Sequence, residues 1–463
     1  MIRLAGLTGA LVFASVLGPC GGDPSRAEQG AAQGSATASP APAEAAPAAP
    51  APEPVVRVEP IPRLSPITPA MLEGLRAIAA RNPELDPHVF AKMGGSSVVS
   101  LAFLHCFETE EPNLAGRDAL RPTLDWFRQG RILSHTPFGR SSTAAEVGWS
   151  IRHGMSGRRP HVVEEVALTH ARFALAFFGS NDVEGKNAHQ FGERLDRLLT
   201  LLTERGVIPV LGSTYPRRPS DAEMNEQVRR YNRMSAAVAA AWGIPYVDFH
   251  QAMLPLPGRG LAEDGIHPNT YVVRARGRAC DFGAEGLAHG NNVRNLMVLE
   301  MLDALRRGFV AGEPAPAADR PALRGVGSAG DPVRVATLPF SDRRLATSLA
   351  GGAYTTTAEC AGEVVEGQRQ VYRMTTAEPL RVRVTALAMG PIEARVEVRA
   401  AGSATCLGHG EEEQVLDLPA GVHELSVVVF RPRRLPEDVS GEPRYLLVVD
   451  VEPPASTPAR RGR

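Results

Sequence analysis

Hydrophobic positions along the chain follow two different periods, and the change between them divides the chain. Before residue 310, four short apolar runs alternate with longer amphipathic stretches. The runs are VFAKM (89–93), FALAFF (173–178), VIPVLG (207–212) and IPYVDF (244–249). Continuous apolar runs of this kind are typical of strands that are buried on both faces of a parallel sheet.

The stretches between these runs predict helices. In residues 188–206, apolar side chains recur at spacings of three and four, namely Phe191, Leu195, Leu198, Leu199 and Leu202. In residues 220–243, Ser220 is the expected N-cap, and Glu223 three residues later completes a capping box. A closing helix is predicted over 287–302, where Asn291 and Asn292 are expected to cap the helix or to line the site.

Alternation of strands and helices predicts a doubly wound α/β sandwich. The site of such a sheet lies beyond the carboxyl ends of its strands.

After residue 332 the apolar residues alternate with polar ones at period two, and Gly and Pro separate the runs. This pattern predicts an antiparallel β-sandwich. The runs that carry it cover residues 378–388, 392–401, 413–430 and 444–453.

Two stretches rich in Ala and Pro or Gly mark the domain boundaries. The predicted organisation is a signal peptide at 1–20, a disordered tether at 21–56, a first domain at 57–310, a linker at 311–332, a β-sandwich domain at 333–453 and a tail at 454–463.

The N-terminus has the features of an export signal. Arg3 precedes the apolar stretch Leu4 to Leu17, which is too short for a permanent membrane-spanning helix. The following LGPC resembles a bacterial lipobox with Cys20 as the lipid-bearing residue, although Pro19 stands where a small residue is usual. We expect an exported, membrane-anchored lipoprotein of the cell envelope. A secreted protein and an uncleaved anchor are the alternatives.

Four cysteines remain if Cys20 carries lipid, namely Cys106, Cys280, Cys360 and Cys406. An even number in an oxidising compartment suggests two disulfides, and three pairings are possible. The domain organisation favours Cys106–Cys280 and Cys360–Cys406. Free buried thiols are the alternative for each pair.

Charge and metal-ligand spacing limit the possible functions. Lys and Arg total 50 against 51 Asp and Glu, so the net charge of −1 argues against nucleic-acid binding and leaves the lipid anchor as the expected membrane contact. No H-E-x-x-H or C-x-x-C motif occurs, so we expect no metal and no cofactor. The histidines without metal-ligand spacing are His88, His135, His153, His161 and His170.

The stretch KMGGSSVVS, residues 92–100, follows the first predicted strand. Ser96 at its tip is either a nucleophile or part of an ordinary strand-to-helix turn, and Ser97 is the competing nucleophile. Lys92 is expected to reach solvent at the strand end.

Three further stretches carry candidate catalytic chemistry. FFGSND follows the second strand, where Gly179 permits close backbone approach and the Asn181 amide is a candidate oxyanion donor or helix cap. In LAEDGIHPN, Asp264 precedes His267 by three residues, a spacing at which the carboxylate can orient the imidazole as a base. In AAEVGWSIRHG, Gly148 is a weaker candidate donor, with Gly139 as its competitor. The pair Asp248 and His250 is interpreted as structural.

Together, Ser96, Gly148, Gly179-x-Asn181 and Asp264-x-x-His267 resemble the SGNH hydrolase (GDSL-type esterase/lipase) superfamily over residues 85 to 305. The resemblance implies a flavodoxin-like α/β fold. It implies Ser96 as nucleophile, His267 as base and Asp264 as its orienting group. It also implies an oxyanion hole formed by the N–H groups of Ser96 and Gly148 and the side chain of Asn181. The first motif departs from the family form, because Gly95 stands where Asp is usual.

The second domain resembles the bacterial pre-peptidase C-terminal type of β-sandwich. The resemblance depends on CAGEVVEGQRQVYRMTTAEPLRVRV, CLGHG, LPAGVHELSVVVF and SGEPRYLLVVDV. It implies an accessory module of a secreted enzyme, with no assignable binding residues.

The predicted function is an exported serine esterase that hydrolyses short-chain acyl esters of small molecules or glycans without a cofactor. One alternative is a non-catalytic surface binding protein with a decayed hydrolase fold, supported by Gly95. Another is an envelope O-acyltransferase. The sequence does not indicate an oligomeric state.

Overall fold

The computed structural model describes residues 53–346, 354–355, 360, 364–365, 367–403, 405–410, 413–430 and 442–452. The expected signal peptide, Cys20, most of the tether and the tail at 454–463 lie outside these residues. Among the residues that are described, no helix has the length and apolar character needed to cross a bilayer.

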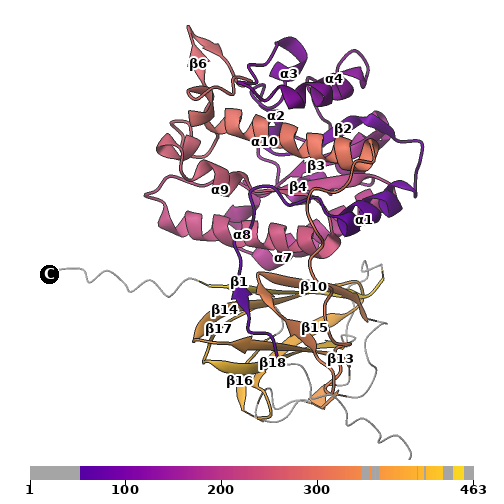
Figure 1. Ribbon diagram of the computed structural model, residues 1–463, viewed down its shortest axis with the longest axis vertical. Helices are drawn as coiled ribbons and strands as arrows, with labels where there is room; N and C mark the ends of the chain where they lie inside the picture. The colour runs from indigo at the N-terminus through magenta and orange to yellow at the C-terminus, as the bar shows by residue number, and fades with distance from the viewer. Residues whose placement is uncertain are drawn as a thin grey trace, which may run out of the picture. The chain divides into compact units, whose positions relative to one another are not determined.

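A four-stranded parallel sheet forms the centre of the α/β part (Figure 1). Its order is β2 (Asp86–Gly94), β3 (Ala171–Phe177), β4 (Ile208–Gly212) and β5 (Tyr246–Val247). Each strand contains part of one predicted apolar run, and every residue of β3 and β4 is buried. The last strand is shorter than its run because the Asp248 side chain accepts a hydrogen bond from the Gln251 N–H and begins helix α9 (Phe249–Met253). This contact agrees with a structural role for Asp248.

Helices cover the sheet on both sides, with α10 (Gly290–Leu305) on one side and α7 (Ala188–Glu204) and α8 (Ala222–Trp242) on the other (Figure 1). The predicted helices 188–206 and 220–243 therefore exist. The predicted cap of the second is wrong, because Asp221 rather than Ser220 accepts the Met224 N–H.

The other helices of the α/β part are shorter. They are α1 (Pro69–Ala79), α2 (Ser96–Val99), α3 (Cys106–Thr109), η1 (Asp118–Leu120), α4 (Arg121–Gln129), α5 (Ile151–Gly154), α6 (His161–Thr169), η2 (Asp182–Gly185), η3 (Pro257–Gly260), η4 (Gly286–Ala288) and η5 (Arg306–Val310).

The β-sandwich consists of two sheets. One has the order β10 (Phe340–Leu345), β19 (Arg444–Val451), β14 (Leu380–Met389) and β17 (Glu413–Leu418). The other has the order β16 (Cys406–Gly410), β15 (Glu393–Ala400), β18 (Gly421–Phe430), β13 (Gln368–Thr376) and β8 (Val333–Val335). Neighbouring strands are antiparallel except β8 and β13, which are parallel. The predicted Cys360–Cys406 disulfide is confirmed.

Short strands accompany the two sheets. β11 (Tyr354–Thr355) pairs with β12 (Val364–Val365). β1 (Arg57–Val58), at the start of the described chain, pairs with β9 (Thr337–Leu338) beside the sandwich.

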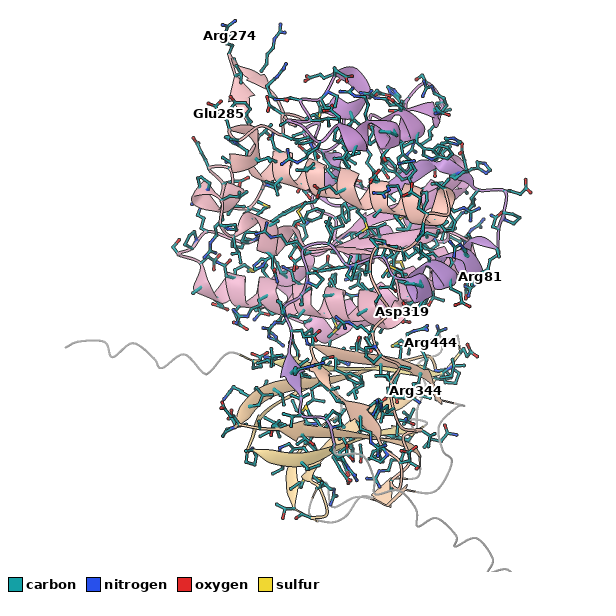
Figure 2. The ribbon with its side chains drawn as sticks, viewed as in Figure 1. Arg81, Arg274, Glu285, Asp319, Arg344 and Arg444 are labelled. Atoms are coloured by element: carbon teal, nitrogen blue, oxygen red, sulfur yellow. A yellow bond between two sulfur atoms is a disulfide. The ribbon has the colours of Figure 1, made fainter. Side chains whose placement is uncertain are left out.

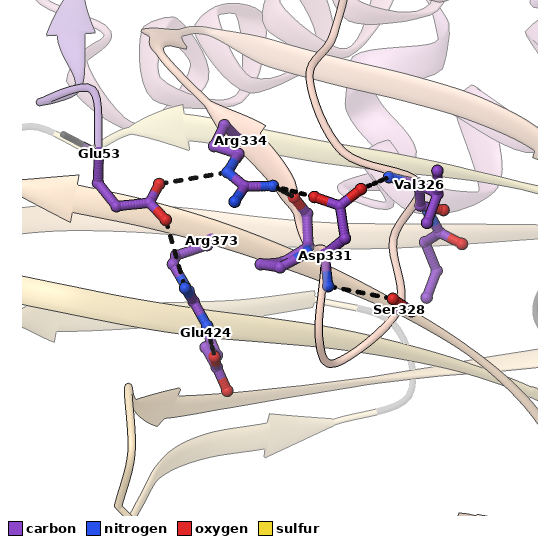
Figure 3. A network of polar contacts seen from close by, with 9 residues as sticks. Glu53, Val326, Ser328, Asp331, Arg334, Arg373 and Glu424 are labelled. Carbon is purple, nitrogen blue, oxygen red and sulfur yellow. Dashed lines mark hydrogen bonds and ion pairs between the residues drawn. The ribbon is translucent and has the colours of Figure 1, made fainter. Parts of the chain in front are cut away.

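The segment that precedes β1 is joined to the sandwich by ion pairs. Glu53 contacts Arg334 at 3.4 Å and Arg373 at 3.3 Å (Figure 3). In the neighbouring linker, Asp331 accepts a hydrogen bond from the Val326 N–H (Figure 3). Glu53 was assigned to the tether, and Arg57 and Val58 were assigned to the first domain. All three contact the second domain instead.

Side chains of α7 and α8 also contact sandwich strands. Arg230 contacts Glu413 at 2.6 Å, and Arg233 contacts Asp450 at 3.1 Å. From the sandwich, Arg343 reaches Asp196 at 3.1 Å and lies over the Trp242 ring. These contacts join the two parts of the compact unit Pro52–Arg463.

Candidate active site

The turn between β2 and α2 brings Ser96 to the carboxyl end of the sheet. A Cβ atom on Gly94 would lie 2.6 Å from the Phe177 carbonyl oxygen at the end of the neighbouring strand. A Cβ atom on Gly95 would lie 2.8 Å from the Asn181 amide nitrogen and 3.0 Å from the Trp149 carbonyl oxygen. A side chain at position 95, including the usual Asp, would therefore displace the Asn181 amide or press on the Trp149 carbonyl group. Gly95 permits the close approach of the Ser96 turn to Asn181.

The two adjacent serines have different surroundings. The Ser96 hydroxyl lies 2.7 Å from Nε2 of His267. The Ser97 side chain is buried, and its hydroxyl accepts a hydrogen bond from the Tyr215 hydroxyl at 3.2 Å. Of the two, Ser96 is the serine that contacts a base.

The His267 turn is held by Asp264. One carboxylate oxygen lies 2.6 Å from Nδ1 of His267, and the other accepts the backbone N–H groups of Ile266 and His267 at 2.9 and 3.0 Å. Burial raises the pKa of Asp264, but the hydrogen bonds from His267 and Ile266 outweigh it and lower the pKa to about 2. An ionised Asp264 favours the tautomer in which Nδ1 carries the proton and Nε2 accepts from the Ser96 hydroxyl.

Gly179 and Asn181 lie next to this pair. Gly179 has a φ of +124°, and its N–H donates to Asp182, which also accepts the Ile151 N–H. The Asn181 amide donates to the Trp149 carbonyl oxygen at 2.8 Å and does not cap η2. Its second N–H hydrogen is not used by that bond, so the amide retains a donor on the side of the Ser96 turn.

The two glycines that compete as a second donor lie in different places. Gly148 has a φ of +82° and precedes Trp149, whose carbonyl oxygen contacts Asn181. A Cβ atom on Gly139 would instead overlap the Glu108 carboxylate. Gly148 is therefore the one whose segment reaches the Ser96 turn.

Polar side chains at the start of α10 contact the segments next to these turns. Asn291 and Asn292 were expected to cap the helix or to line the site, whereas Arg294 and Asn295 were not identified, and the residue at the N-cap is His289. Asn291 donates to the Pro268 carbonyl oxygen at 2.8 Å, Arg294 donates to that of Ser97 at 2.7 Å, and Asn295 donates to that of Ala102 at 2.8 Å. All three are at most 5% exposed. Four buried polar residues in GNNVRN, at the start of an otherwise apolar helix, were the available signal.

The predicted disulfide between Cys106 and Cys280 is confirmed. It joins α3, which follows the Ser96 turn, to the segment that follows the His267 turn.

The expectation that Lys92 reaches solvent is wrong. Lys92 is 3% exposed and donates to the Phe138 carbonyl oxygen at 2.9 Å, and burial lowers its pKa to about 7.

Comparison with known proteins identifies the α/β part. The model of the GDSL-like Lipase/Acylhydrolase family matches residues 115–274. The chain carries a GDSL-like lipase/acylhydrolase domain. The match includes Gly148, Asn181, Asp264 and His267 and begins after Ser96. No curated protein matches the chain.

Solved structures similar to the acylhydrolase domain include three of low identity. A GDSL-like lipase from Bacteroides thetaiotaomicron is 15% identical, over 50% of this chain and 98% of its own, with a TM-score of 0.29. A lipase/acylhydrolase from Enterococcus faecalis is 17% identical, over 46% and 94%, with a TM-score of 0.31. A catalytic mutant of an acetylxylan esterase from Geobacillus stearothermophilus is 14% identical, over 46% and 93%, with a TM-score of 0.31.

A hairpin of the acylhydrolase domain follows the His267 turn. Its strands are β6 (Val272–Val273) and β7 (Arg276–Gly277), and Figure 2 shows Arg274 at its projecting tip. The base of the hairpin is held by Asn292, which accepts the Tyr271 N–H and donates to the Arg278 carbonyl oxygen.

Within the described residues, no group of three His, Cys, Asp or Glu side chains has the arrangement of a metal site.

Proposed function

We propose that this protein is an exported serine esterase in which Ser96, His267 and Asp264 form the catalytic triad. The observation that carries the proposal is the continuous chain of contacts from Ser96 Oγ through both nitrogens of the His267 ring to Asp264, at 2.7 and 2.6 Å. A nucleophile, a base and an orienting carboxylate in this order are what acyl transfer needs.

The first half of the reaction forms an acyl-enzyme. Ser96 Oγ attacks the ester carbonyl carbon while Nε2 of His267 takes the hydroxyl proton. His267 then returns that proton to the leaving alcohol as the carbon–oxygen bond of the ester breaks. Asp264 remains ionised throughout and stabilises the imidazolium that forms between the two proton transfers.

The second half releases the acid. Water attacks the acyl carbon, Nε2 of His267 accepts a water proton, and Ser96 regains a proton as it leaves. In both halves, negative charge develops on the carbonyl oxygen. We assign its stabilisation to the N–H groups of Ser96 and Gly148 and to the amide N–H of Asn181 that the Trp149 bond does not use.

We infer a preference for short acyl chains. Ser96 is partly exposed, and three exposed apolar side chains lie one to three residues from the proposed catalytic groups: Val99, Val147 and Ile266, at 42%, 70% and 42% exposure. Exposed apolar side chains this close in sequence to the proposed catalytic groups are candidates to contact a small acyl group. No cofactor takes part in this mechanism.

The proposed location is outside the cytoplasm, either as a lipoprotein anchored through Cys20 or as a secreted protein. The two disulfides, Cys106–Cys280 and Cys360–Cys406, support an oxidising compartment. Metabolic labelling with a fatty-acid probe, compared between the natural protein and Cys20→Ala, distinguishes the two forms.

The test uses the purified protein and aryl esters of increasing acyl length. We expect turnover that is greatest for acetate or butyrate and is lost in Ser96→Ala, with Ser97→Ala as the matched control that keeps most activity. Loss in Ser97→Ala and retention in Ser96→Ala would refute the assignment of the nucleophile. An inactive natural protein whose Ser96 is also not labelled by a fluorophosphonate would favour a binding protein, and transfer to a glycan hydroxyl faster than to water would favour an O-acyltransferase.

A further inference from the structure

Helix α10 contacts both segments that carry the proposed reacting groups. Asn291 donates to the carbonyl oxygen of Pro268, the residue after His267. One turn later, Arg294 donates to the carbonyl oxygen of Ser97, the residue after Ser96. A single rigid element therefore holds the backbone next to both members of the 2.7 Å contact.

The Ser97 carbonyl needs a partner from outside its own helix. Helix α2 contains only Ser96–Val99, and the Ser100 N–H donates to the Ser96 carbonyl oxygen. The last carbonyl groups of a helix have no intrahelical donor. Arg294 supplies the donor to one of them, so its side chain helps to hold this single turn on the core.

Arg294 is an unusual residue for a purely structural contact. Its side chain is 0% exposed, and its guanidinium lies 3.6 Å from the centroid of the Phe103 ring, with Tyr215 at 5.3 Å. Its Nε and Nη2 atoms have no hydrogen-bond partner, and no carboxylate pairs with it among the described residues. Burial lowers its pKa to about 10, so the group remains charged at neutral pH.

A buried cation without a counter-ion is costly, and an apolar side chain would fill the same space at lower cost. Aromatic faces offset only part of this cost. A buried guanidinium that is unpaired among the described residues and contacts the residue after the proposed nucleophile therefore points to a role in the reaction.

We propose that Arg294 is a positioning residue for the reaction, which holds Ser96 in line with His267 through the Ser97 carbonyl. The proposal rests on the proposed esterase function. Misplacement of a nucleophile by about 1 Å costs roughly 10²-fold in rate. Arg294 acts on the alignment for attack rather than on binding, so its loss lowers kcat and leaves KM nearly unchanged.

Arg172 provides a matched control. It is also a buried arginine, at 5% exposure, and it donates to four backbone carbonyl groups, those of Ala79, Asn82, Leu85 and Gly206. It is the second residue of β3 and so lies at the amino end of the strand, opposite the proposed site.

The experiment measures kcat and KM on a soluble aryl ester for Arg294→Met, Arg294→Lys and Arg172→Met, with the number of competent sites counted by fluorophosphonate titration. We expect kcat per titrated site to fall roughly 10²-fold in Arg294→Met with KM within about threefold. Arg294→Lys should recover about tenfold of that loss and stay below the natural kcat. Arg172→Met should lose folded protein but keep the natural kcat per site.

A natural kcat per titrated site in Arg294→Met would overturn the proposal, as would equal losses in Arg294→Met and Arg294→Lys. If Arg294→Met yields no folded protein, Arg294→Lys alone decides. A kcat lowered at unchanged KM supports positioning, and a natural kcat refutes it. These outcomes differ from failure of the esterase function itself, in which the natural protein neither turns over an ester nor reacts with the fluorophosphonate.

Discussion

The two halves of the proposed site are built in different ways. The His267 turn is local and open, because the residue that orients it lies three positions earlier and both side chains are exposed, at 44% and 46%. The Ser96 turn is assembled from distant parts of the chain. Asn181 lies against Gly95, and Arg294 holds the Ser97 carbonyl group from a buried position.

The geometry of the two turns therefore depends on different parts of the chain. The geometry of a local turn is set by a few neighbouring residues, whereas the geometry of a turn held by distant groups depends on the packing of the whole domain. The base should therefore depend less on distant parts of the chain than the nucleophile does, although Asn291 also contacts the segment after His267.

The largest expected effect comes from the histidine of the open half. His267→Ala should lower kcat by roughly 10⁴-fold or more because the proton has no acceptor. Asp264→Ala should cost less, roughly 10²-fold, since water can solvate an exposed imidazole. Steady-state hydrolysis of an aryl ester measures both. Equal losses in the two variants would show that the orienting carboxylate is as necessary as the base and would contradict the expected solvation of the imidazole by water.

The next effect tests Asn181, which joins the two halves. Asn181→Ala should lower kcat by roughly 10²- to 10³-fold with a small change in KM, because the amide donates most strongly to the charged transition state. Titration of competent sites separates this from unfolding. A natural kcat per folded molecule would mean that the bond to the Trp149 carbonyl is the whole role of the residue.

A smaller loss is expected from adding one carbon atom to the buried half. Gly95→Ala should lower kcat by roughly 10- to 100-fold and destabilise the domain by about 1–3 kcal/mol, because the new Cβ atom would press on Asn181 and Trp149. Gly74→Ala is the control, since its Cβ atom would meet nothing within 4 Å on helix α1. Urea unfolding and kinetics on both variants test this, and an unaffected Gly95→Ala enzyme would disprove the close contact.

The smallest effect on turnover concerns Lys92, whose titration changes stability behind the Ser96 turn. Burial lowers the pKa of Lys92 to about 7, with Glu165 opposing and Arg140 and Arg294 adding to the shift. Between that value and its unfolded pKa of 10.5, the unfolded chain binds a proton that the folded chain does not. Stability should therefore rise with pH by about 1.4 kcal/mol per unit above pH 7, other groups being equal.

Urea unfolding at pH 7, 8 and 9 measures this slope. Lys92→Met removes the titrating group and should flatten the curve, while ester hydrolysis per folded molecule stays within about twofold. An unchanged slope in Lys92→Met would assign the pH dependence to other groups.

The alternating strands and helices were predictable because each buried strand is a continuous apolar run and each long helix repeats at three and four. Boundaries were harder, since a cap depends on which of two adjacent polar residues turns toward the backbone, as Asp221 does in place of Ser220. The burial of Lys92 was not predictable, because its partner, the Phe138 carbonyl, lies 46 residues away.

In the proposed site, too, local contacts could be predicted and contacts between distant residues could not. Asp264 and His267 are recognisable from spacing alone, because their contact is local. The reason for Gly95 and the role of Arg294 could not be read from the sequence, since they depend on approaches across 86 and 197 residues, to Asn181 and to Ser97.

The disulfide between Cys106 and Cys280, which are 174 residues apart in sequence, closes the chain between them into a covalent ring. His267 lies inside the ring, and Ser96 lies before it. A protease that cuts once at the exposed Arg158–Arg159 pair would thus leave two polypeptides, one with Ser96 and one with His267, that stay linked until a reductant is added. If the protein is exported as proposed, this bond would let it survive a nick that separates its proposed nucleophile from its base along the chain.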